Sequence, residues 1–160
     1  MKLAFYLAAK GSPKDKIIAA YTGGPFSHCE LVINDAYLPY IPEPLIYPHD
    51  AGGSLCYSSS SAAPRDGCGF EVIDLADGKW TLCSLPPANW SAAVMKAVAD
   101  SGKPYDWRGI VGFVVKGQDN KNERFCSEEC VLLLQASGLL LGVNAVMTSP
   151  NYLAQLVGVL

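Results

Sequence analysis

Residues 124–130 read Arg124-Phe-Cys-Ser-Glu-Glu-Cys130 and lead into the apolar run Val131-Leu-Leu-Leu134. This pattern predicts a helix over Ser127–Ser137, with Cys126 about one residue before its start. Unpaired backbone N–H groups and the positive end of the helix dipole stabilise a thiolate at such a position. Cys126 is therefore a candidate nucleophile, whereas Cys130, one turn further along, is expected to pack in the core.

Length and composition limit the classes of protein to consider. The chain has 160 residues, of which half are hydrophobic and 17% are charged, so we expect one globular domain over residues 1–160. The net charge is −3, and no cluster of lysines and arginines could follow a phosphate backbone. A nucleic acid is therefore not an expected partner.

The first ten residues could pass for a short signal peptide. Their apolar run is short, and Lys10 interrupts it before a convincing cleavage site. A buried strand over Met1–Ala8 fits this segment better. No apolar run is long enough to span a bilayer, so the sequence predicts a cytoplasmic chain made without a leader and without a transmembrane segment.

The clearest strand in the first half is Ser27–Asn34, with the sequence Ser-His-Cys-Glu-Leu-Val-Ile-Asn. Its alternation places His28 and Glu30 on one face and the intervening apolar side chains on the other. A polar face on such a strand must meet solvent or other polar groups. His28 and Glu30 are therefore candidates for a functional site.

Apolar patterns and turn residues predict further elements on both sides of this strand. The expected strands are 1–8, 54–58, 70–75 and 79–85, with the last two paired around Ala76-Asp-Gly78. The expected helices are 14–21, 91–101, 106–115 and one that opens at Ser149-Pro-Asn-Tyr152. Asp35–Gly53 holds four of the eleven prolines, and a loop of this length is typical of a lid, a binding loop or a disordered insertion, of which we expect a lid over the cleft.

A histidine beside Cys126 would complete a nucleophile and base. His28 is one of two histidines in the chain, the other being His49 in the proline-rich loop. An imidazole with a pKa near neutral could take the thiol proton and return it to a leaving amine. A third polar group would fix its tautomer, and Glu30 and Ser58 are the candidates for that role.

The six cysteines permit other interpretations. Their positions in strand-like and helical segments of a chain this large favour free thiols over disulfides. A zinc site built from Cys126, Cys130, His28 and Cys29 is a minor alternative, because no CxxC pair is present. The leading interpretation requires no metal and no cofactor.

Four short motifs resemble the circularly permuted NlpC/P60 papain-like hydrolases, in particular the YiiX-like branch with phage and prophage members. They are Ser27-His-Cys-Glu30, Tyr105-Asp-Trp-Arg-Gly109, Phe125-Cys-Ser-Glu128 and Ser149-Pro-Asn-Tyr-Leu153. In ordinary NlpC/P60 domains the cysteine helix precedes the histidine strand, whereas here Cys126 follows His28. The resemblance covers residues 1–157 in outline and extends the expected setting to a phage-associated protein.

The resemblance implies an α+β fold in which helices pack on a small antiparallel, barrel-like sheet. It implies Cys126 as nucleophile and His28 as general base. It also places Tyr105 and Asp106 near the cysteine helix, and these two residues with Tyr57 are the candidate substrate-binding residues. Relatives commonly have a polar third residue, often a carboxylate, on the following strand, where this chain has Tyr57-Ser-Ser-Ser-Ser61.

The predicted function is a cysteine peptidase or amidase that cleaves an amide bond, with a cell-wall peptide as the substrate that the resemblance suggests. Two alternatives remain open at this point. One is a lipid acyl hydrolase or acyltransferase with the same chemistry. The other is a catalytically degenerate domain that binds a ligand or serves as a phage accessory protein. The sequence predicts a peptide or acyl partner and does not predict an oligomeric state.

Overall fold

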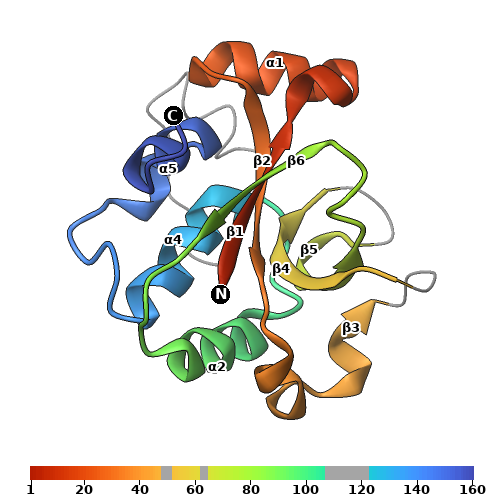
Figure 1. Cartoon of the computed structure of the whole chain (residues 1–160), viewed down its shortest axis with the longest axis vertical. Coiled ribbons are helices and arrows are strands. Elements are labelled where there is room, and N and C mark those ends of the chain that lie inside the picture. Colours follow the sequence, from red (N-terminus) through yellow and green to blue (C-terminus); the bar gives the residue numbers. More distant parts are fainter. Residues whose placement is uncertain (48–51, 62–64, 107–122) are drawn as a thin grey trace.

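The computed structural model describes residues 1–47, 52–61, 65–106 and 123–160. Within these residues the fold is α+β, with a six-stranded sheet packed against helices (Figure 1). The strand order is β3-β5-β4-β2-β1-β6. The strands are β1 (Lys2–Leu7), β2 (Phe26–Val32), β3 (Ile46–Tyr47), β4 (Ser54–Ser60), β5 (Gly67–Ile73) and β6 (Trp80–Ser84).

The expected antiparallel, barrel-like sheet is wrong in two respects, although the α+β class is confirmed. The sheet is mixed, because the short β3 pairs with β5 in parallel whereas the other neighbours are antiparallel. It is also open, because β3 and β6 form its two ends and do not pair with each other in the described residues.

The predicted hairpin between the fifth and sixth strands is also wrong. β5 pairs with β4, whereas β6 crosses to the other end of the sheet and pairs with β1. β1 explains this arrangement, because its consecutive residues Leu3, Ala4 and Phe5 are all fully buried. A strand buried on both faces occupies the interior of a sheet and needs a hydrogen-bonded neighbour on each side.

Helices α2 (Trp90–Asp100), α4 (Cys126–Ala136) and α5 (Pro150–Leu156) contribute to the main apolar core with one face of the sheet. Cys29 and Leu31 of β2 belong to this core. The predicted helix over 127–137 is confirmed as α4, which begins one residue earlier, at Cys126. The described residues contain no helix with both the length and the apolar character needed to cross a bilayer.

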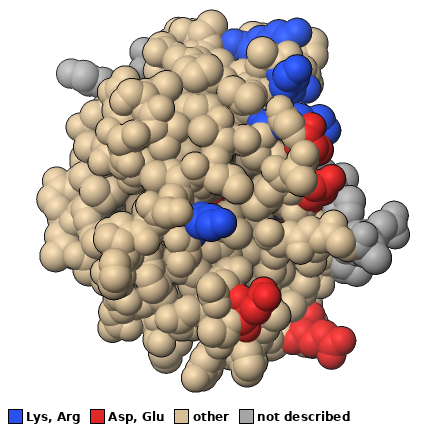
Figure 2. Space-filling view, in the orientation of Figure 1, with Lys and Arg blue, Asp and Glu red and all other residues tan. Residues whose placement is uncertain are grey.

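The other face of the sheet carries only a small apolar cluster, of Ala4, Val32 and Cys56 with three partly buried neighbours. His28 and Glu30 lie on β2 next to this cluster, so the predicted alternation along the strand is confirmed. Figure 2 shows charged side chains of both signs along one side of the molecule and few over the rest of that view.

The start of β2 is fixed by α5 and by α1 (Pro13–Thr22). The amide of the buried Asn151 accepts from the Phe26 backbone N–H at 2.9 Å and donates to the Phe26 carbonyl oxygen at 2.8 Å. It also donates to Thr22 Oγ1 at 2.6 Å. A Cβ on Gly24 would lie 2.4 Å from Asn151 Oδ1, so this close approach requires glycine.

The described part of Asp35–Gly53 does not form the expected lid. It contains two short 3-10 helices, η2 (Asp35–Tyr40) and η3 (Glu43–Leu45), followed by β3. Ile41 is buried in the main core, and among the described residues of this segment none lines the pocket described below. Trp107, His49 and most of the predicted helix 106–115 lie outside the described residues.

Candidate active site

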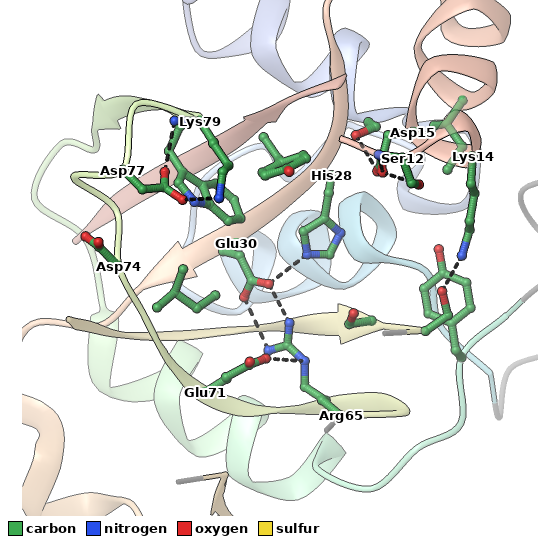
Figure 3. A pocket seen from close by; sticks show the side chains of 18 of the residues that line it. Ser12, Lys14, Asp15, His28, Glu30, Arg65, Glu71, Asp74, Asp77 and Lys79 are labelled. Carbon is green, nitrogen blue, oxygen red and sulfur yellow. Dashed lines mark hydrogen bonds and ion pairs between the residues drawn. The ribbon is translucent and has the colours of Figure 1, made fainter. Parts of the chain in front are cut away.

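A pocket of about 500 Å³ opens between α1, the polar end of β2 and the turn that leads to β6. His28, Glu30 and Arg65 line it, together with Trp80 and Tyr105 (Figure 3). Ionisable groups from segments far apart in the sequence therefore meet in one concave site, which is a common arrangement for a ligand site.

Cys126 is the first residue of α4 and is 4% exposed. The segment before it is fixed by Arg124, whose carbonyl oxygen accepts from the Asp106 N–H at 2.8 Å and from Ser59 Oγ at 2.7 Å. The hydroxyl of Ser127 donates to the carbonyl oxygen of Thr148 at 2.6 Å. These bonds hold the sulfur-bearing turn from both sides.

The ring of His28 lines the pocket and also interacts with the thiol of Cys126. Its side chain is 20% exposed, and Nε2 lies 2.7 Å from Glu30 Oε1. Because Nε2 is engaged by the carboxylate, Nδ1 is the nitrogen that can exchange a proton with sulfur. The Trp80 ring lies beside the His28 ring in an edge-to-face arrangement, with the two ring centroids 6.3 Å apart.

The separation of two strands explains how His28 meets a helix that packs against the opposite face of the sheet. β2 pairs with β4 only at Leu31↔Tyr57 and Val32↔Cys56. Nearer to His28, the carbonyl oxygen of Cys29 accepts instead from the Ser58 hydroxyl at 2.7 Å. The sheet therefore opens beside His28, where the N-terminus of α4 lies.

Cys126 and His28 are close enough to change each other's ionisation. A hydrogen bond from the Cys29 thiol lowers the pKa of Cys126, and the positive charge of His28 lowers it further against the effect of burial, so it lies well below the ordinary value. Burial lowers the pKa of His28, but Cys126 and Glu30 outweigh it and raise this pKa to about 10. Thiolate and imidazolium are therefore the favoured pair near neutral pH.

Glu30 is bound on its far side by Arg65, which sequence reasoning missed. Arg65 Nη2 lies 2.5 Å from Glu30 Oε1, and Nη1 lies 3.4 Å from Oε2 (Figure 3). Burial raises the pKa of the Glu30 carboxyl, but Arg65 and His28 outweigh burial and keep it below its ordinary value. Glu30 therefore remains a carboxylate beside His28.

A signal for Arg65 was present in the sequence. A glutamate on a mostly apolar strand needs a cation, and only three arginines are available, at positions 65, 108 and 124. Arg65 lies two residues before the first residue of β5, a strand with glycines at 67 and 69. A Cβ on Gly69 would come within 3.3 Å of the Arg65 side chain, so glycine leaves room for it to cross β5.

The other predicted site residues lie at different depths. Tyr105 lines the pocket, whereas Asp106 is buried beside it and bonds Arg124 through its backbone. Ser58 is fully buried with its hydroxyl on the Cys29 carbonyl, so Glu30 and not Ser58 binds the far nitrogen of His28. Tyr57 packs on Phe70 in the main core at a ring distance of 4.6 Å, and so it presents no surface to a substrate.

The charges of Glu128 and Glu129, which follow Cys126 in α4, are partly compensated by Arg124. Arg124 Nη1 lies 3.3 Å from Glu128 Oε1, and Arg124 Nε lies 3.7 Å from Glu129 Oε2. Burial raises the pKa of Glu129 to about 7, so this side chain is largely protonated below neutral pH. Protonation of Glu129 and the ion pair of Glu128 with Arg124 both reduce repulsion of a Cys126 thiolate.

The zinc alternative finds no support in the arrangement of the four candidate ligands. In the parts of the chain that the structure describes, which include all four, no group of three or more His, Cys, Asp or Glu side chains is placed to hold a metal ion. All six cysteines are free thiols, as predicted.

No protein-family model matches the chain, and neither a curated protein nor a solved structure matches it.

Proposed function

We propose that this protein is a cysteine hydrolase that cleaves an amide or peptide bond through Cys126 and His28. One observation carries the proposal. Beside a pocket, the cysteine at the N-terminus of α4 interacts with His28, and His28 in turn contacts the buried carboxylate of Glu30. This is the arrangement of nucleophile, base and orienting group that acyl transfer requires.

The proposed reaction begins with attack of the Cys126 thiolate on the substrate carbonyl carbon. The backbone N–H of Cys126 lies in the first turn of α4, where N–H groups have no acceptor within the helix, and it can donate to the oxyanion. The His28 imidazolium then gives its Nδ1 proton to the leaving amine, which departs as the thioester forms. Water, deprotonated by the neutral ring, hydrolyses the thioester and restores the thiolate.

Glu30 holds the ring in the orientation that this cycle needs. Its Oε1 accepts from Nε2–H, so the proton that moves is the one on Nδ1. The carboxylate also stabilises the imidazolium after the thiol is ionised. A third catalytic group therefore need not come from the serine-rich strand β4.

The permuted NlpC/P60 resemblance belongs to this proposal. The chain order, with the histidine strand before the cysteine helix, is the order of the permuted members and supports this part of the proposal. A cell-wall peptide remains the proposed substrate on the basis of that resemblance. The pocket volume of about 500 Å³ is compatible with a short peptide segment.

The experiment is detection of the covalent intermediate. The protein is mixed with a panel of p-nitrophenyl esters and peptide p-nitroanilides, including cell-wall peptide fragments, and quenched samples are measured by intact-mass spectrometry. We expect one acyl group on Cys126, no acylation of C126S, and slower acylation of H28Q. Absence of any adduct on Cys126 with every ester and anilide would contradict the proposal.

A further inference from the structure

Arg65 is a buried cation whose contacts are almost entirely with the charged groups behind His28. Its side chain is 2% exposed, and both terminal nitrogens face the Glu30 carboxylate. Nη1 also donates to the Gly69 carbonyl oxygen at 2.9 Å, and Nε lies 3.6 Å from Glu71 Oε2. Because burying a cation is costly unless it is paired, this arrangement calls for an explanation.

We propose that Arg65 is a positioning residue, which keeps Glu30 ionised and correctly oriented so that Glu30 can hold the His28 imidazolium for reaction with Cys126. This inference deepens the proposed hydrolase function and rests on it. Glu30 connects the two groups, because its Oε1 contacts both Arg65 Nη2 and His28 Nε2 (Figure 3).

The argument begins with the burial of Glu30. A fully buried carboxyl group without a cation takes up a proton, because the low-dielectric surroundings penalise its charge. His28 alone is a poor counter-ion, because its charge depends on the same equilibrium. Arg65 carries a permanent charge, and its planar fork matches both carboxylate oxygens. It can therefore fix the charge of Glu30 independently of the proton on His28.

Other titratable groups face this chain of contacts but cannot replace Arg65. Glu71 on β5 and the Cys56 thiol on β4 are anionic or neutral, so neither supplies a cation to Glu30. Asp15 on α1 acts on His28 from the other side and is held by hydrogen bonds from Ser12 and Ser27. The thiol of Cys126 on α4 is the remaining partner of the ring.

The basic groups at the pocket are also committed elsewhere. Lys14 Nζ lies 2.5 Å from Ser61 Oγ and over the Tyr105 ring, and Lys79 pairs with Asp77 at 2.8 Å. Besides the His28 imidazolium, Arg65 is therefore the cation that the described residues bring to Glu30.

The test compares the full-length wild-type chain with R65M and R65K by nitrogen-15 NMR of the histidine rings. R65M removes the charge at similar volume, and R65K keeps a charge but loses the forked geometry. H28Q assigns the His28 signals. We expect the pKa of His28 to fall by at least about one unit in R65M and by a smaller amount in R65K. We also expect alkylation of Cys126 at pH 6 to slow at least tenfold in R65M. A His28 titration unchanged from wild type in both variants would overturn the proposal.

A double variant separates positioning from general stability. E30Q/R65M removes both members of the buried pair, a change that proteins often tolerate better than loss of one member. We expect the His28 pKa of the double variant to be no lower than that of E30Q alone, because without the carboxylate the Arg65 charge can only repel the imidazolium, and its removal relieves that repulsion. A further fall beyond E30Q would overturn a role that acts through Glu30.

The NMR measurement remains decisive if R65M does not fold, because R65K and the double variant report the same quantity. It also distinguishes the two proposals. A lack of acyl adducts would count against the hydrolase, whereas the titration of His28 depends only on its surroundings and would still test Arg65.

Discussion

The Glu30 side chain determines which nitrogen of His28 faces the thiol. It binds Nε2 on one side and the Arg65 guanidinium on the other, and it is fully buried. Such a group contributes through its charge as well as its geometry, so an amide of the same shape cannot replace it.

We therefore predict that E30Q reacts more slowly at Cys126 by about 10²-fold, because the imidazolium loses its anionic partner and the ring loses its orientation. The rate of p-nitrophenol release from an activated ester measures this. E43Q is the matched control, because Glu43 is exposed in η3 and does not line the pocket. Equal rates in E30Q and wild type would rule out the orienting role.

The ionisation of Glu129 is expected to make the stability of the protein depend on pH. Burial raises the pKa of its carboxyl from 4.5 to about 7, and neither carboxylate oxygen has a hydrogen-bond partner. A carboxyl group with a raised folded-state pKa favours the folded state below its unfolded pKa and loses this contribution as the pH rises through the folded value. The free energy of unfolding should therefore fall between about pH 4.5 and 7 by about 3 kcal/mol from this group.

E129Q tests this prediction. The variant should be more stable than wild type at pH 8 and should differ little from it at pH 4.5, as measured by urea unfolding at both pH values. E43Q should leave the difference between the two pH values unchanged, because Glu43 is exposed. A wild-type pH dependence in E129Q would mean that Glu129 ionises normally.

At the scale of elements, the contact between α5 and β2 positions His28. Asn151 is fully buried and makes three hydrogen bonds, one to Thr22 and two to the backbone of Phe26. Phe26 lies on β2, two residues before His28. Its removal leaves buried backbone groups unpaired and frees the start of the strand.

N151A should lower the free energy of unfolding by about 2–4 kcal/mol. It should also slow the reaction of Cys126, because β2 carries the histidine. Urea unfolding and the ester assay measure the two effects. T22V is the control, because it removes one of the three bonds and should have a smaller effect on both. An N151A variant as stable as T22V would contradict this account of how β2 is held.

The elements differ in how much of them the sequence could predict. Local patterns were sufficient for α4, for the alternation along β2 and for the Ser149 cap of α5, whose hydroxyl accepts from Tyr152 N–H at 3.1 Å. They were insufficient for β6, because the choice between β5 and β1 as its partner depends on burial of β1 on both faces. The number of residues between the strands does not reveal which of them pairs with β6.

The same division holds within the candidate site. Cys126 and His28 were recognisable because helix starts and polar strand faces have local signatures. Arg65 was not recognised, since its partner Glu30 is 35 residues away and the pair is created by sheet topology. Tyr57 is a candidate substrate-binding residue by sequence, but its side chain lies in the main core, and its local sequence does not reveal which face of β4 it occupies.

For the whole molecule, the six thiols should divide into one reactive group and five slow ones. Burial raises the pKa of Cys29 and Cys56 and raises that of Cys68 to about 12, and it also raises the pKa of the partly exposed Cys83. Cys130 is fully buried in the core. We predict that an aromatic disulfide reagent at pH 6.5 labels one thiol rapidly in the native protein and six after denaturation.

Loss of the rapid phase in C126S would assign it to the proposed nucleophile. The stability of that variant, followed by circular dichroism, controls for general unfolding. A rapid phase that persists in C126S, or several rapid thiols in the folded wild-type protein, would show that burial does not protect the other five.

The pH dependence of Cys126 alkylation by iodoacetamide tests the central claim most directly, because it reports the ionisation of the sulfur without any assumption about substrate. The rate at this site, followed by peptide mass spectrometry, should remain high well below the ordinary thiol pKa of about 8.5. In H28Q the profile should move towards that ordinary value. A wild-type profile with a midpoint near 8.5, unchanged in H28Q, would contradict the thiolate–imidazolium pair and with it the proposed hydrolase.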